Sequence, residues 1–281
     1  MSWLAVAKKD FRDAVQSRAL WALLGVFVVV STLMSYAYVE LPEFFGGPTG
    51  PSVAGLIFFM AGSVSLFITL TAIVVCYKAI AGERELGSIK LLLALPHTRG
   101  EVLLGKVLGR AAVLVVAAAI GLGVGFGVGF ALLGTIEVVS LVLFLLVTLL
   151  FTGVFAAIIV SLSATTGSTA RATTLALGFF VVFELLWDFA PLAVVYVVNG
   201  FSLPQQMPDW VFLVSQLPPT SAYFSTLVAV LPESASAAGA STGAEGIDAV
   251  YATPEIGLVV LALWLVVPLA VGYHRFTTAD L

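Results

Sequence analysis

The chain has 281 residues, of which 60% are hydrophobic and only 10% are charged, and its formal net charge at pH 7 is −4. This composition excludes an ordinary soluble domain, which carries far more charged surface, and we expect no nucleic-acid partner. The single cysteine, Cys76, excludes an intrachain disulfide framework. The sequence therefore predicts an integral membrane protein.

The first predicted element is an amphipathic helix over Met1–Arg18. Its apolar arc holds Trp3, Leu4, Ala7, Phe11 and Val15 at helical spacing, and its polar arc holds Lys8, Lys9, Arg12 and Asp13. A basic helix with an aromatic face is expected to lie in the membrane interface among lipids. Two roles stay open, a segment that only sets topology and a helix that contacts a partner.

Six long apolar stretches follow. Each is long enough to cross a hydrocarbon core about 30 Å thick at ~1.5 Å per helical residue. They cover Ala19–Val39, Gly55–Tyr77, Ala111–Leu133, Val138–Leu162, Thr173–Phe189 and Ile256–Tyr273. The sequence thus predicts an all-α membrane protein with six transmembrane helices in one domain, 1–281.

The basic residues fall on one side of this predicted membrane. All twelve Lys and Arg residues lie before the first span, between the second and third, between the fourth and fifth, or after the sixth. Cytoplasmic loops carry an excess of Lys and Arg. We therefore predict a multi-pass protein of the plasma membrane with both termini in the cytoplasm.

The cytoplasmic segment 78–110 is the most polar part of the chain. Gly87 permits a turn, and Ser88 is the expected N-cap of a short helix that Pro96 ends. This helix is apolar but has charged flanks, so it needs a groove to bury it. The groove belongs either to a partner protein or to this chain's own inner surface.

A second helix start is predicted in the same segment. Thr98 and Glu101 are spaced as a capping box, in which each side chain satisfies a backbone N–H of the first turn. This box is expected to begin the helix that leads into the third span.

The segment resembles the one between spans two and three of ABC-2 type permeases, in particular the branch of haloarchaea and of nitrous oxide reductase maturation. The resemblance is carried by Glu83-Arg84-Glu85-x-Gly87-Ser88-x-Lys90-x-Leu92-Leu93-x-Leu95-Pro96-x-x-Arg99 and then Leu104-Gly105-Lys106. It extends to the six-span layout and the Lys9–Asp13 stretch. Ser88 departs from the family, where Thr is common.

The resemblance implies a coupling helix that docks on a separate ATP-binding subunit, in a transporter built from two permeases and two ATPases. The second permease would be another copy of this chain or a homologous one. The residues that would take the coupling role are Glu83, Arg84, Glu85, Gly87, Ser88, Leu92 and Pro96.

The third span contains a run of alternate glycines. Small residues let membrane helices approach closely, and a flexible pore lining is the alternative interpretation. The pattern does not identify the neighbouring helix. The glycines are Gly121, Gly123, Gly125, Gly127 and Gly129.

The fifth span carries two acids, Glu184 and Asp188, four residues apart and beside Trp187. Acids in membrane spans usually face protein or water, so this pair is a candidate for a translocation path. Alternatively, Trp187 marks the outer headgroup level and both acids are already in water.

The outside segment 199–254 has two predicted parts. Up to Leu231 it holds enough apolar residues for short helices on or in the outer leaflet, separated by Pro218-Pro219. The resemblance implies that these helices are re-entrant. Pro232–Pro254 is rich in Ala, Ser and Gly and is expected to be flexible.

No Gly-x-x-x-x-Gly-Lys-Ser/Thr motif occurs in the sequence, so ATP hydrolysis is expected in a partner subunit and not in this chain. The positions of His97, His274 and Cys76 give no metal-ligand pattern, and we expect no metal and no cofactor. The predicted function is a permease subunit that exports an unidentified substrate. A secondary transporter and a non-transporting membrane scaffold are the alternatives.

Overall fold

The computed structural model describes residues 3–41, 44, 50–94, 98–204, 207–241 and 253–279. Every regular element within these residues is a helix. They are α1 (Trp3–Val15), α2 (Arg18–Glu40), α4 (Val53–Cys76), α5 (Ala81–Glu85), α6 (Ser88–Ala94), α7 (Arg99–Leu133), α8 (Val138–Ala164), α9 (Thr169–Phe180), η1 (Val181–Leu186), α10 (Phe189–Val198), α11 (Asp209–Ser215), α12 (Pro219–Val230), α13 (Pro232–Ala238) and α14 (Ile256–Thr277).

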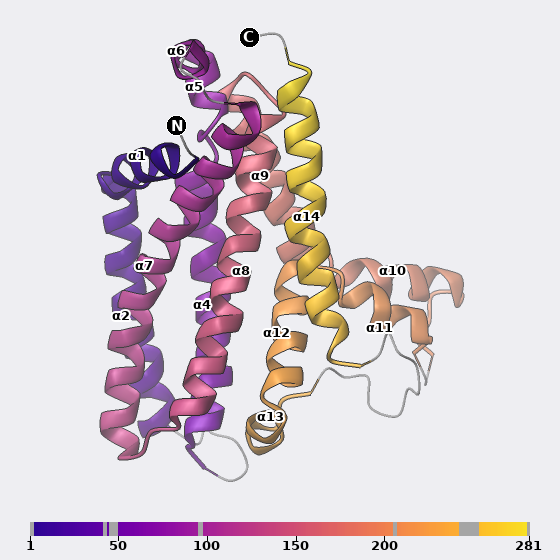
Figure 1. The fold of residues 1–281 in the computed structure, drawn as a ribbon. Helices are drawn as coiled ribbons and strands as arrows, with labels where there is room; N and C mark the ends of the chain where they lie inside the picture. Colours follow the sequence, from indigo (N-terminus) through magenta and orange to yellow (C-terminus); the bar gives the residue numbers. More distant parts are fainter. Residues whose placement is uncertain are drawn as a thin grey trace.

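Six of the described helical stretches are long and apolar enough to cross a membrane, which confirms the predicted six-span all-α architecture. Figure 1 shows these helices running side by side in one bundle. The stretches are Arg18–Glu40, Val53–Glu85, Arg99–Leu133, Val138–Ala164, Thr169–Leu186 and Ile256–Thr277.

The fifth span differs from the predicted Thr173–Phe189. It starts at Thr169, widens into the π-helical turns of η1, and is followed by a separate helix, α10. In Figure 1, α10 runs sideways from the bundle and does not continue the span. A π-helical segment alters the side-chain register and often marks a functional position. The structure places Glu184 inside this segment.

Helices α4 and α8 are the most buried of the six spans, whereas α2, α9 and α14 expose most of their apolar surface. Helix α7 packs on α2 and α4, and α8 packs on α14. The exposed apolar faces are the surfaces available to lipid or to another membrane subunit.

Only every second glycine in the run of the third span packs against another helix. A Cβ at Gly121 would overlap the ring of Phe27 on α2, and a Cβ at Gly125 would lie 2.9 Å from the Cβ of Ser31 on the same helix. Gly123 has nothing within 4 Å of an added Cβ. A Cβ at Gly129, in the same register, would overlap the side chain of Leu56 on α4, so the neighbours that the sequence left unidentified are α2 and α4.

One end of the bundle, which we call the basic end, carries α1, α5, α6 and both chain termini (Figure 1). All twelve Lys and Arg residues belong to the segments that meet there. The predicted capping box is confirmed at this end: Thr98 accepts from the backbone N–H of Glu101, and the Glu101 carboxylate accepts from the N–H of Thr98.

The segment after α10 contains two helices, α11 and α12, with the expected break at Pro218-Pro219. Helix α12 packs into the bundle against α8 and α14, and its buried Tyr223 shares a 2.9 Å hydrogen bond with Thr148 on α8. The stretch predicted to be flexible, Pro232–Pro254, begins with the helix α13, which packs on α4. Residues 242–252 lie outside the described residues.

Candidate functional site: the helix junction between the second and third spans

The junction begins where α4 ends and the chain turns toward α5. The backbone N–H groups of Ile80 and Ala81 both donate to the hydroxyl of Ser163 on α8, at 3.2 and 3.0 Å. All three residues are buried. Because a buried N–H without an acceptor is costly, Ser163 fixes the start of α5 against α8.

Three successive side chains of α5 then bind three different helices. The Oε1 atom of Glu83 accepts from Nζ of Lys106 on α7 at 2.8 Å. A guanidinium nitrogen of Arg84 donates to the last carbonyl of α8 at 3.2 Å. The Oε2 atom of Glu85 accepts from the first N–H of α9 at 2.7 Å. A displacement of α5 would therefore be felt by the third, fourth and fifth spans.

The sixth span is connected to the same end through Arg99, which begins α7. Its Nη1 atom donates to the carbonyls of Phe276, Thr277 and Ala279 at 2.6, 2.9 and 2.9 Å. A cation at a helix C-terminus satisfies carbonyls that have no partner within the helix. Hydrogen bonds thus join α5, α7, α8, α9 and α14 at the basic end.

A buried group of four charged residues lies beneath the junction. Asp10 of α1 accepts from Nζ of Lys106 at 3.2 Å and from Nε and Nη2 of Arg110 at 2.6 and 3.1 Å. Lys106 also pairs with Glu83. The side chains of Asp10 and Lys106 are only 5% and 3% exposed. Two acids balance two bases, as buried charges require. We call these four residues the charge cluster.

Two glycines of α7 allow α1 to reach this cluster. A Cβ at Gly105 would lie 2.7 Å from the Cβ of Val6, and a Cβ at Gly109 would lie 2.7 Å from the carbonyl oxygen of Ala7. The second contact is with backbone, so no side-chain rotation could relieve it. The close approach of α1 to α7 therefore depends on both glycines.

Helix α1 is amphipathic, as predicted. The buried residues are Val6, Ala7, Asp10 and Ala14, which pack against α7. Trp3 and Leu4, which the sequence placed on the arc that faces lipid, are 44% and 58% exposed. Figure 1 shows α1 lying across the end of α2. Its apolar surface is thus divided between its own chain and the exterior.

The apolar helix α6 uses part of its surface within the chain. Ile89 is fully buried and Leu92 packs partly buried against the core. Ser88 is not the expected N-cap: it is the first residue of α6, and its hydroxyl donates to the carbonyl of Glu83 at 3.3 Å. Gly87 makes the expected turn, with a φ of 73°.

The remaining predicted member of the coupling segment, Pro96, lies outside the described residues. Leu86, which lies between Glu85 and Gly87, was not singled out by the sequence. It is 84% exposed, more than any other large hydrophobic residue of the described chain. An apolar side chain left so open, next to residues bound to three helices, is a candidate contact for another protein.

The two acids of the fifth span lie away from this junction, beside α11 and α12. Glu184 is half-buried, and its Oε2 accepts from the hydroxyl of Thr220 at 2.5 Å. Its other carboxylate oxygen, Oε1, is buried without a hydrogen-bond partner among the described residues. Asp188 is exposed and lines a pocket. Trp187 between them donates to the carbonyl of Val214 at 2.7 Å, which ties this turn to α11.

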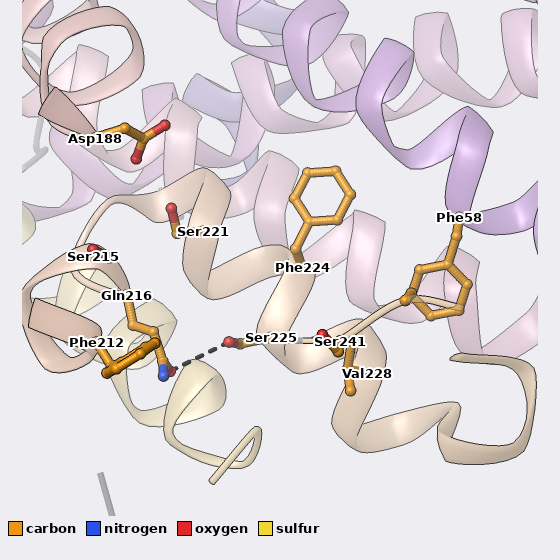
Figure 2. Close-up of a pocket in the computed structure, with 11 residues that line it drawn as sticks. Phe58, Asp188, Phe212, Ser215, Gln216, Ser221, Phe224, Ser225, Val228 and Ser241 are labelled. Atoms are coloured by element: carbon orange, nitrogen blue, oxygen red, sulfur yellow. Dashed lines mark hydrogen bonds between the residues drawn. The ribbon is translucent and has the colours of Figure 1, made fainter. Parts of the chain in front are cut away.

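That pocket, which we call the α11–α12 pocket, has a volume of about 300 Å³. Figure 2 shows the residues that line it, contributed by α4, α11 and α12 and by the turn that holds Asp188. Its polar groups include the hydroxyls of Ser221 and Ser225 and the amide of Gln216, and Phe224 adds an aromatic wall. The described residues contain no group of three His, Cys, Asp or Glu side chains arranged to hold a metal ion.

Sequence reasoning missed Ser163 and Arg110, and it did not pair Asp10 with Lys106. Asp10 could have been found, because it shares one helical arc with Val6 and Ala14, an unusual place for an acid. Lys106 belongs to the motif that was quoted, but its partners are distant in sequence. No local signal marks Ser163.

Comparison with known proteins shows the family of the chain. The family model described as ABC-2 family transporter protein matches residues 4–281. The chain is 32% identical over 117 residues to a probable ABC transporter permease protein NosY of Stutzerimonas stutzeri and 31% identical over 116 residues to its namesake in Pseudomonas aeruginosa. Each alignment spans 41% of this chain and 41% of the relative.

The chain therefore belongs to the ABC-2 transporter family, and the predicted resemblance is confirmed. It is a multi-pass membrane subunit of this transporter class. Permease subunits of ABC transporters are generally not enzymes themselves, and the family implies an ATPase partner in general terms.

Proposed function

We propose that this chain is the permease of an ABC exporter and that a separate ATPase subunit docks on the α5–α6 segment. The observation that carries the proposal is the set of bonds from Glu83, Arg84 and Glu85 to α7, α8 and α9. A push on α5 is transmitted to three membrane helices at once, which is the property that a coupling segment needs.

The docking surface is formed by the side of the segment that the chain leaves open. Leu86 provides an exposed apolar contact, and Lys90 on α6 is also exposed. Ile89 and Leu92 face the chain's own core instead, so they hold α6 in place beneath the partner. We propose a coupling role for Pro96 as well, on the resemblance alone, because it lies outside the described residues.

In the working transporter, two permeases and two ATPase subunits alternate the access of a cavity between the permeases. The second permease is another copy of this chain or a homologous permease, and the exposed apolar faces of the outer helices are available to it. Closure of the ATPase subunits on ATP moves α5 and α6, and the charge cluster carries α1 with them. The basic end faces the cytoplasm of a plasma membrane, as the positive-inside rule requires.

Glu184 and Asp188 are proposed to border the substrate path. Support comes from the π-helical turn that carries Glu184, the unpaired Oε1 of its carboxylate and the pocket that Asp188 lines. Polar groups placed in a membrane span usually face protein or a water-filled cavity.

The test replaces Leu86 by Asp. Because Leu86 is 84% exposed, the change leaves the permease fold intact but places a charge where an apolar partner surface would bind. Copurification of the ATPase subunit from the native membrane should be lost. Leu203→Asp is the matched control, since Leu203 is 57% exposed and lies in the α10–α11 connection, outside the junction.

Retention of the ATPase by the Leu86→Asp variant would refute docking on this surface. Loss of the ATPase by both variants would show that the effect is not specific to the segment. A chain that transports substrate with no ATPase bound would favour the secondary-transporter alternative, and one that transports nothing would favour the scaffold.

A further inference from the structure

The α11–α12 pocket combines an acid, an amide, several hydroxyls and aromatic rings in a space of about 300 Å³. This size is at the lower end of pockets that bind small molecules. Ser225 donates to the amide oxygen of Gln216 at 3.3 Å, which holds that side chain against the wall of the pocket (Figure 2). The pocket is therefore shaped by packed helices on most of its sides.

The negative charge of the α11–α12 pocket has no basic side chain paired with it among the described residues. Asp188 forms no ion pair with any of the described residues. Between Arg110 and Arg275 the sequence contains a single Lys or Arg residue, Arg171. It lies in the first turn of α9, as does Thr169, whose N–H donates to Glu85 of α5 at the basic end. No cation of this chain is thus available to the carboxylates beside α11 and α12.

Glu184 adds a second negative group next to the pocket. It lies one turn before Asp188, and its Oε1 has no hydrogen-bond partner among the described residues. Thr220, which binds the other oxygen of Glu184, directly precedes the pocket residue Ser221. The region therefore favours a positively charged occupant over a neutral or anionic one.

We propose that the α11–α12 pocket binds a small organic monocation of the alkylammonium class. Asp188 provides the counter-charge, Phe212 and Phe224 provide aromatic faces that attract a diffuse cation, and Ser221 provides a hydroxyl that can accept a hydrogen bond from a polar substituent. Binding of such a cation does not depend on the proposed function. The further step, that this cation is the substrate class for the path near Asp188, rests on the proposed function.

An inorganic metal ion fits the pocket less well. Hard cations require several oxygen ligands converging at short distance, and the described residues hold no cluster of three metal-binding side chains. Two of the lining side chains named above, Phe212 and Phe224, are apolar rings, which suit alkyl groups. An ammonium with alkyl substituents matches both parts of the lining.

The test measures binding of radiolabelled choline to the full chain in lipid nanodiscs, with no ATPase subunit present. The comparison ligand is 3,3-dimethylbutan-1-ol, which has the same shape as choline but no charge. Choline should bind at least about tenfold more tightly, a difference of about 1.4 kcal/mol, because only choline carries the charge that Asp188 and the aromatic rings attract. Asp188→Asn should remove that preference.

Asp209→Asn is the matched control, because Asp209 begins α11 but does not line the pocket. It should keep the preference for choline. Equal binding of choline and the neutral alcohol, or unchanged choline binding in Asp188→Asn, would overturn the proposal. If Asp188→Asn does not fold, two other measurements decide the question. They are the preference of the unaltered chain for choline over the neutral alcohol, and choline binding to Phe224→Leu, which lacks one aromatic face.

Binding is measured without the ATPase, so this experiment is independent of the docking test with Leu86→Asp. Absence of choline binding together with normal ATPase copurification would overturn the ligand class alone. Choline binding together with retention of the ATPase subunit by the Leu86→Asp variant would overturn the docking surface alone.

Discussion

Replacing Gly109 by Ala should detach α1 from α7 and thereby loosen the charge cluster. The added Cβ would lie 2.7 Å from the carbonyl oxygen of Ala7 and 3.2 Å from the backbone nitrogen of Phe11. Both atoms belong to the backbone of α1, so the helix itself has to move. Asp10, which lies between them in sequence, would move away from its partners on α7.

The magnitude follows from two opposing effects. Overpacking of this kind costs about 1–3 kcal/mol, and the better helix propensity of Ala returns about 0.5–1 kcal/mol. We therefore expect a net loss of up to about 2.5 kcal/mol, and about 1 kcal/mol at the middle of both ranges, from the free energy of unfolding. The control is Gly123→Ala on the same helix, where a Cβ would have no atom within 4 Å. That change should be neutral or slightly stabilising.

The assay uses Cys76, which is the sole cysteine of the sequence and is fully buried. A thiol-reactive fluorophore should label it only as the protein opens, so the labelling temperature reports unfolding close to the charge cluster. The Gly109→Ala variant should be labelled at a lower temperature than the unaltered chain. Equal labelling temperatures for Gly109→Ala and Gly123→Ala would refute the argument that α1 needs this close approach.

The remaining predictions concern the junction and the topology. Ser163→Ala leaves two buried backbone N–H groups without their acceptor, which should cost about 2 kcal/mol or more and lower the labelling temperature of Cys76. Ser161→Ala on the same helix should be nearly silent, because the Ser161 hydroxyl is buried without a hydrogen-bond partner among the described residues. In a Cys76→Ala background, a cysteine at Ser236 should react with an impermeant thiol reagent in intact cells and one at Ser88 should not. Labelling of the Ser88 position from outside would reverse the proposed orientation.

The sequence alone determined the architecture of the membrane domain. Six apolar stretches are visible because the length of a span depends only on local hydrophobicity and bilayer thickness. The capping box at Thr98 was also predictable, since it depends on two residues three positions apart. The one-sided distribution of Lys and Arg likewise needs no tertiary structure to be seen.

The sequence also singled out the run from Glu83 to Arg99, which we propose as the coupling segment, but it did not decide how the short helix in it packs. Ser88 was expected to cap a helix that it in fact begins, and the apolar residue Ile89 turns inward. Which face of a short helix is buried depends on what lies above and below it. A single helix of seven residues carries too little periodicity to decide this.

The contacts that make the junction rigid were decided by the tertiary structure. Asp10 and Lys106 are 96 residues apart, and Ile80 and Ser163 are 83 apart. No local pattern pairs such residues, because a buried ion pair or hydrogen bond is defined by the packing of whole helices. For the same reason, the sequence identified the glycines of the third span but not α2 and α4 as their neighbours, and it could not foresee the π-helical turn that redirects the fifth span beside Glu184.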